Sequence, residues 1–179
     1  MINYPYYYQE DLFDQDEIIA INKILEEHKV GKDEFGTEYK KADSYNVVLP
    51  EEHPFLDKVN FRTHTINRKE FGYDLYDHYM KTCNLNYYHK DDNEYDWHID
   101  ANPYSSKDDL KITVLINISL QEYTGGKLFI FPGRVIEVKE LEKPGSTIWF
   151  PSFTNHKVEP VTSGKRTSVS FWFEGPGFK

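Results

Sequence analysis

Short runs of aromatic and β-branched residues, separated by turn-forming residues, make up most of the chain beyond residue 70. Aromatic and β-branched side chains suit a pleated surface, whereas Gly, Pro, Asn and Asp favour the turns between strands. Tight turns are expected at Gly125-Gly126, Pro132-Gly133 and Pro144-Gly145. The pattern predicts strands near 70–76, 81–89, 95–98, 110–120, 127–131, 134–138, 146–150, 156–160 and 166–174.

The pattern before residue 70 is typical of helices. Asp14 is a candidate N-cap, and Glu17 follows three residues later, as in a capping box. Apolar residues then recur at helical spacing, and Gly31 is a plausible end of this helix. These apolar residues are Ile18, Ile21 and Leu25.

Four further segments complete this part of the chain. Residues 1–11 are aromatic and polar, which predicts an edge strand. A charged loop is expected at 32–41, a strand at 44–49, and a second helix over about 51–65.

Together these elements predict one domain of the α+β class, spanning 1–179. Helical support occupies about 10–65, and a double-stranded β-helix (jelly-roll) core occupies about 70–174. The 179 residues are enough for a real hydrophobic core. No repeat or linker divides the chain.

Composition excludes several classes of protein. With Cys83 as the single cysteine, no disulfide can form within the chain, and a reducing compartment is allowed. The formal net charge of −9 disfavours a nucleic-acid partner, because phosphate backbones would be repelled. No apolar run resembles a signal peptide or a membrane span, so we expect a cytoplasmic protein that does not contact membranes.

The segment 95–100 carries the strongest chemical signal. On an extended strand, residues two apart point to the same face, so His98 and Asp100 would project side by side. An imidazole and a carboxylate make up two thirds of a facial triad for Fe(II). His156 is the best candidate for the third ligand. The other histidines lack a carboxylate at strand spacing and are interpreted as surface or structural: His28, His53, His64, His78 and His89.

Arg166 follows His156 by ten residues, at the start of a strand-like run. Because strand side chains alternate, only one of Lys165 and Arg166 can point inward. A guanidinium binds a carboxylate with two parallel hydrogen bonds and stays charged in a dry pocket, so Arg166 is the preferred inward residue.

This ordered set resembles the iron(II)/2-oxoglutarate-dependent dioxygenases, and within them the branch of the prolyl 4-hydroxylases and hypoxia-sensor prolyl hydroxylases. The resemblance covers roughly 70–174 and includes His98-x-Asp100, His156, Gly125-Gly126 and Arg166. Collagen-type members carry Lys where Arg166 stands, and sensor-type members carry Tyr where Asn117 stands. The substrate subclass is therefore open.

The resemblance implies roles for individual residues. His98, Asp100 and His156 would bind Fe(II), and Arg166 would hold the far carboxylate of the co-substrate 2-oxoglutarate. Tyr88, Thr113 and Asn117 would also bind the co-substrate, and Tyr95, Trp97 and Trp172 would contact substrate. The cofactors implied are Fe(II), 2-oxoglutarate and O₂, with ascorbate as an accessory reductant.

The implied reaction is hydroxylation of an unactivated C–H bond, with release of succinate and CO₂. The leading substrate is a prolyl residue in a peptide or protein. The alternatives are a free amino acid or other small molecule, and a cupin-like binding protein without turnover. The polar loop 101–109 is a candidate mobile lid, and the acidic loop 91–94 is interpreted as solvated.

Overall fold

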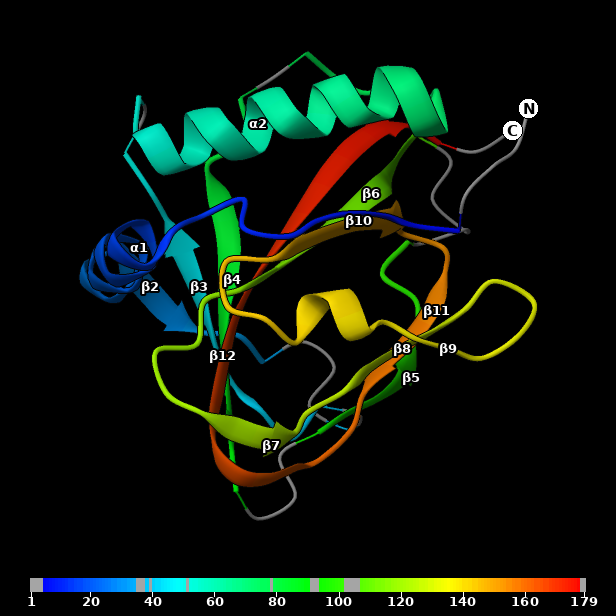
Figure 1. Cartoon of the computed structure of the whole chain (residues 1–179). Helices are drawn as coiled ribbons and strands as arrows, with labels where there is room; N and C mark the ends of the chain where they lie inside the picture. Colours follow the sequence, from blue (N-terminus) through cyan, green and yellow to red (C-terminus); the bar gives the residue numbers. More distant parts are fainter. Residues whose placement is uncertain are drawn as a thin grey trace.

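The structure is a computed structural model that describes residues 5–34, 38, 40–50, 52–77, 79–90, 94–101 and 107–177 (Figure 1). Within these residues the chain folds mainly into strands, with two α-helices before the strand-rich part. The elements in chain order are β1 (Tyr7–Gln9), α1 (Gln15–Glu27), β2 (Lys29–Lys32), β3 (Asp43–Val48), α2 (Pro54–Ile66), η1 (Asn67–Phe71), β4 (Thr82–His89), β5 (Tyr95–His98), β6 (Asp108–Asn117), β7 (Tyr123–Gly125), β8 (Leu128–Phe131), β9 (Ile136–Glu137), η2 (Lys139–Leu141), β10 (Thr147–Pro151), β11 (Asn155–Val158) and β12 (Val161–Pro176).

The described strands form two antiparallel sheets. The larger sheet has the order β1-β10-β6-β12-β4-β3-β2, and β7 also pairs with β12. The smaller sheet has the order β5-β11-β8-β9. Strand β12, red in Figure 1, runs diagonally through the molecule and joins β6, β4 and β7. This arrangement agrees with the predicted jelly-roll core.

Two hydrophobic clusters hold these layers together. The first joins α1 and α2 to one face of the larger sheet and includes Leu25, Leu56 and Trp149. The second lies between the sheets and includes Leu115, Ile130 and Phe150. A fully buried side chain of this size contributes roughly 1.5–3 kcal/mol. The face of the larger sheet that α1 and α2 do not cover points toward β5 and β11. Part of this face packs in the second cluster, and another part lines a pocket.

The capping box predicted at Asp14 is confirmed. The Asp14 carboxylate accepts from Glu17 N at 2.9 Å, and the Glu17 carboxylate accepts from Asp14 N at 2.9 Å. The helix ends at Glu27 and not near Gly31, however, because the chain turns at His28 and continues as β2 beside β3. The expected edge strand near the N-terminus is β1, which pairs with β10.

The strand expected at 70–76 was wrong. α2 continues there into η1, which ends at Gly72 with a φ of 72°. The Asn67 side chain then holds the next turn, since its amide donates to Tyr73 O and its oxygen accepts from Tyr73 N. The aromatic pattern of this segment reflects packing against the core and not pairing in a sheet. None of the described helices combines the length and apolar character needed to cross a membrane.

Candidate metal centre and co-substrate pocket

The two histidines predicted as ligands lie side by side on neighbouring strands. His98 ends β5, His156 lies in β11, and the two residues are direct partners in the register of the smaller sheet. Their imidazole rings are 4.1 Å apart between centroids. Pairing of two strands far apart in the sequence thus brings both imidazoles to one point.

Asp100 reaches the same point by a different route from the one expected. β5 ends at His98, and Asp100 lies in the bend that follows, so the two residues do not share a continuous strand face. The bend is fixed because Asp100 N and Ala101 N both donate to Ser152 O at 3.0 Å. The predicted convergence of His98 and Asp100 is found, but a turn produces it.

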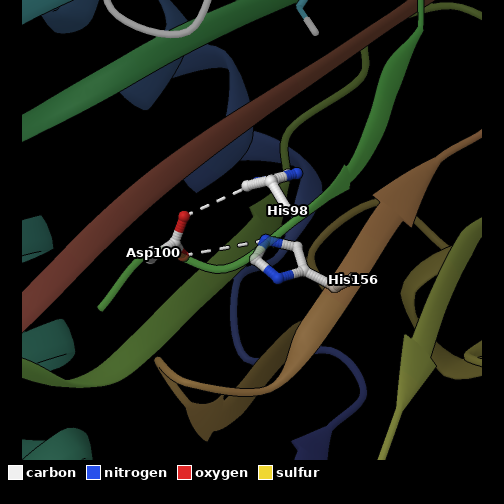
Figure 2. Close-up of side chains that lie close together, drawn as sticks. All are labelled: His98, Asp100 and His156. Carbon is white, nitrogen blue, oxygen red and sulfur yellow. Dashed lines mark ion pairs between the residues drawn. The ribbon is translucent and has the colours of Figure 1, made fainter. Parts of the chain in front are cut away.

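Figure 2 shows the three side chains directed toward one another. One candidate ligand atom from each residue lies within 4.8 Å of those of the other two. His98 Nε2 is 3.6 Å from Asp100 Oδ1, and His156 Nε2 is 3.7 Å from Asp100 Oδ2. Two imidazole nitrogens and one carboxylate facing a common point are the donor set that suits Fe(II), so the residues present fit that metal.

The hydrogen bonds of the imidazoles leave the correct nitrogen free. His98 Nδ1 is 2.7 Å from Asp96 O, and His156 Nδ1 is 3.0 Å from Thr154 O. Since a carbonyl oxygen can only accept, each Nδ1 carries the proton and each Nε2 keeps its lone pair. Burial, and next the neighbouring His156, lower the pKa of His98 to about 4. A neutral imidazole is the form that binds a metal ion.

Thr113 lies behind the carboxylate ligand. Its hydroxyl donates to Asp100 Oδ2 at 2.7 Å, and Ser152 Oγ is 3.0 Å from the same hydroxyl oxygen. Thr113 was expected to bind the co-substrate. The structure instead places it in contact with Asp100, where it fixes the direction of the carboxylate.

A pocket of about 420 Å³ extends from these ligands between the two sheets. Arg166 and Tyr88 are cross-strand partners on β12 and β4, and both line it. The Arg166 guanidinium carbon lies 5.1 Å from the centre of the Tyr88 ring. Burial raises the pKa of the Tyr88 hydroxyl, while the charge of Arg166 acts in the opposite direction.

Arg166 is 2% exposed, so its charge is almost fully removed from water. Its guanidinium donates to Ser168 Oγ at 3.2 Å, and no carboxylate among the described residues forms an ion pair with it. Lys165 points to the other face, where its Nζ lies 3.8 Å from the centre of the Tyr87 ring. The prediction that Arg166 faces inward is therefore confirmed, and a buried guanidinium of this kind fits a ligand carboxylate.

Asn117 does not reach this pocket. Its amide nitrogen lies 2.9 Å from each of three oxygens, Leu141 O, Glu142 O and the Tyr123 hydroxyl, and its two hydrogens are shared among them. The expected co-substrate role is wrong for the described structure, because these bonds commit the carboxamide to the segment after η2.

The three aromatic residues predicted to contact substrate take different positions. Tyr95 stacks on His98, with ring centroids 3.5 Å apart, and lines the pocket. Trp97 faces away from it and contacts Phe131 and Lys157, because it alternates with His98 along β5. Trp172 lines the pocket, and its indole Nε1 is buried without a hydrogen-bond acceptor among the described residues. An unsatisfied buried donor costs about 1–3 kcal/mol.

The sequence did not predict that Lys40 and Asp33 line the pocket. Lys40 Nζ lies 3.0 Å from Asp33 Oδ2, and both side chains are nearly buried. Both residues fall in the stretch interpreted as a charged loop, where no spacing signalled a partner. Most of the candidate lid 101–109, most of the acidic loop 91–94, and His78 lie outside the described residues.

Comparison with known proteins supports the same chemistry. A family model described as the 2OG-Fe(II) oxygenase superfamily matches residues 83–174. A PKHD-type hydroxylase from Pseudomonas putida strain KT2440 is 28% identical over 173 residues, which cover 90% of this chain and 74% of the relative.

Two solved structures are similar over 96% of this chain. A viral collagen prolyl hydroxylase from Paramecium Bursaria Chlorella virus-1, in complex with 2-oxoglutarate, has a TM-score of 0.73, 18% identity and 97% coverage of its own chain. A prolyl hydroxylase from Trichoplax adhaerens, in complex with a peptide fragment of the hypoxia inducible factor oxygen degradation domain, has a TM-score of 0.68, 13% identity and 84% coverage. At such low identity, these two structures show a shared fold.

Proposed function

Because the chain belongs to the 2OG-Fe(II) oxygenase superfamily, we propose that it hydroxylates a prolyl residue in a peptide or protein. The enzyme is a dioxygenase that uses Fe(II), 2-oxoglutarate and O₂. In the proposed reaction one oxygen atom enters the C–H bond of the substrate, and the other enters succinate as 2-oxoglutarate loses CO₂. We propose that residues 1–179 form one domain with this activity.

One observation carries the proposal: the His98, Asp100 and His156 cluster shares its pocket with Arg166. A group of three metal-binding side chains alone would fit many kinds of protein. A buried guanidinium without a carboxylate partner among the described residues adds a place for one end of a dicarboxylate. The pair of features fits a co-substrate that reaches from the metal to Arg166.

The residues of the pocket have different roles in the proposed reaction. His98, His156 and Asp100 would hold Fe(II), which supplies the oxidising chemistry when it is bound with O₂ and 2-oxoglutarate. Arg166 would bind the far carboxylate of 2-oxoglutarate by two parallel hydrogen bonds. Thr113 keeps the Asp100 carboxylate in place, and the aromatic walls limit access of water to the reacting centre.

The prolyl substrate is supported by the names of similar proteins and not by a bound ligand. The viral enzyme is a collagen prolyl hydroxylase, and the Trichoplax adhaerens enzyme was solved with a peptide. Free amino acids and other small molecules remain the alternative substrates. The non-catalytic binding protein is disfavoured, since a scaffold has no need of a buried Arg166 next to a metal cluster.

The test of this function is release of succinate from 2-oxoglutarate. The purified protein is supplied with Fe(II), ascorbate and O₂, with and without a pool of proline-containing peptides. We expect succinate release that the peptides stimulate, and peptides that gain one oxygen atom by mass spectrometry. Succinate release with oxidation of free amino acids alone would keep the chemistry and reject the prolyl substrate. No consumption of 2-oxoglutarate by metal-loaded protein would reject both.

A further inference from the structure

The pocket continues past Arg166 over a floor of small polar side chains on β12, β4 and β3. Residues two apart on a strand share a face, so each strand contributes one residue to each of two rows across the sheet. The inner row, next to Arg166, consists of Ser168, Asn86 and Ser44. The outer row consists of Ser170, Asn84 and Asn46. Asn is depleted in strands, so repeated Asn on one sheet face suggests a use other than packing.

The inner row is occupied by its own hydrogen bonds. Ser168 accepts from Arg166 at 3.2 Å, and Ser44 donates to Asn86 Oδ1 at 2.6 Å. Asn86 in turn donates to Ser170 Oγ at 3.1 Å. Lys40 Nζ donates to Ser44 Oγ at 2.8 Å. This row supports Arg166 and the floor, and has little capacity left for a ligand.

Several hydrogen-bonding groups of the outer row have no partner within the described chain. Asn84 donates to Asp33 Oδ2 at 2.7 Å, but its own oxygen has no partner among the described residues. Asn46 is exposed and lines the pocket, and its carboxamide makes no hydrogen bond within the described chain. Beyond this row, the buried Trp172 Nε1 is also without an acceptor there. Donors and acceptors therefore remain available in the outer row and at Trp172 next to it.

Among the described residues of this floor, the two charged side chains other than Arg166 neutralise each other. Lys40 and Asp33 form an ion pair at 3.0 Å, with side chains 6% and 11% exposed. The proposed function assigns Arg166 to the co-substrate. A free amino acid would bring an ammonium and a carboxylate, and each would need an unpaired counter-charge. A neutral polar ligand fits this floor better.

The length of the outer row also bears on the ligand. Neighbouring strands lie about 4.8 Å apart, so three strands span roughly 10 Å. That is about three residues of an extended chain at roughly 3.3 Å each. Peptide amides alternate donors and acceptors, and a carboxamide presents one of each.

We propose that Ser170, Asn84 and Asn46, with Trp172, bind the main-chain amides that flank the target residue of an extended peptide. This inference rests on the proposed function and deepens it. The substrate is then an internal residue of a chain and not a free amino acid. Because the contacts are to main-chain groups, side chains next to the target are tolerated widely.

The test uses capped pentapeptides with proline at the centre and varied flanking residues. Parent enzyme is compared with Asn46→Leu, Asn84→Leu and Trp172→Phe, and with the control Gln121→Leu, which makes a similar exchange on an exposed loop. We expect each row variant to raise the KM for the peptide about tenfold or more, the loss from one missing hydrogen bond. The KM for 2-oxoglutarate and the behaviour of Gln121→Leu should not change.

A second arm separates hydrogen bonding from a change of shape. The best peptide is remade with an ester in place of one flanking amide, which removes one N–H donor. In parent enzyme the ester should raise the KM, and in Asn84→Leu or Asn46→Leu one of the two ester positions should have little further effect. Additive effects at both positions in every variant would overturn the proposal.

Two further results would overturn it without touching the proposed chemistry. One is parental peptide KM in all three variants, each shown to be folded by its melting curve and by 2-oxoglutarate titration. The other is oxidation of free proline with the same kcat/KM as the best peptide. Asn46 is exposed, so its variant keeps the test valid if Asn84→Leu proves unstable.

Discussion

Gly126 leaves space that the Arg166 side chain needs: a Cβ atom added at Gly126 would lie only 2.9 Å from Arg166 Cδ. The same atom would lie 2.9 Å from Val161 Cγ2, and Gly126 has a φ of +62°. Both the backbone conformation and the space thus require glycine. The Gly125-Gly126 turn, which the sequence predicted as a tight turn between strands, also shapes the site of the Arg166 guanidinium.

We expect Gly126→Ala to weaken binding of 2-oxoglutarate, because the methyl group displaces the Arg166 side chain. Backbone strain should lower stability as well, by about 1–2 kcal/mol. Gly133→Ala is the matched control, since Gly133 also has a positive φ, +107°, but open space around its Cβ position. The measurement is titration of 2-oxoglutarate into each metal-loaded variant without O₂. Equal affinity in both variants would show that the contact does not matter.

Arg166→Ala should weaken binding of 2-oxoglutarate by about 2–4 kcal/mol, the scale for truncating one partner of a buried charge pair. Arg166→Lys keeps the charge but loses the paired hydrogen bonds, so a smaller loss is expected. Calorimetry on the anaerobic metal-loaded protein gives both values. Metal affinity should stay near that of the parent, since Arg166 is not a ligand.

Lys165→Ala is the control for Arg166. Lys165 is its neighbour in sequence but lies over Tyr87 on the opposite face of the sheet. The control should bind 2-oxoglutarate like the parent. If Lys165→Ala loses affinity and Arg166→Ala does not, the assignment of the two basic residues is reversed.

Asp100→Ala should abolish turnover of 2-oxoglutarate and strongly reduce binding of Fe(II), because it removes the charged ligand. The fold should persist, since Asp100 lies in a bend outside the strands. Asp96→Ala is the control: Asp96 is an exposed carboxylate two residues before His98, and its backbone carbonyl still accepts from His98. Metal analysis and succinate release check both variants. If Asp100→Ala turns over 2-oxoglutarate at the parental rate, the Asp100 carboxylate is not a metal ligand.

Thr113→Val should lower metal affinity by about 10–100-fold, the usual effect of removing a hydrogen bond that orients a ligand. Its hydroxyl is the donor to Asp100 Oδ2, and valine keeps the shape without the hydroxyl. Thr113→Ser keeps the hydroxyl and should bind the metal with near-parental affinity. Thr124→Val, at an exposed position, should leave the metal affinity unchanged. Metal titration followed by calorimetry distinguishes these cases. If Thr113→Val binds the metal as tightly as the parent, Thr113 contributes to packing and does not orient the Asp100 carboxylate.

The sequence predicted which three side chains converge at the candidate metal centre, because the residue types that suit a metal ion can be recognised locally. His98 and Asp100 are two residues apart, and an imidazole with a carboxylate at that spacing restricts the choices for a third ligand. The mechanism of convergence was less accurate, since Asp100 lies in a bend held by Ser152. The bend depends on a contact between segments about 50 residues apart, which no local pattern contains.

The sequence by itself determined most of the helices and strands, the capping box at Asp14 and the residue types of the candidate metal centre. Periodicity, caps and ligand types are properties of neighbouring residues, so the printed chain contains them. Tertiary structure alone decided that Thr113 orients Asp100 and that Asn117 turns to the segment after η2. It also decided that Lys40 pairs with Asp33 and that Ser170, Asn84 and Asn46 align in a row. These relations depend on strand register and on hydrogen bonds between distant segments, which form only when the sheets assemble.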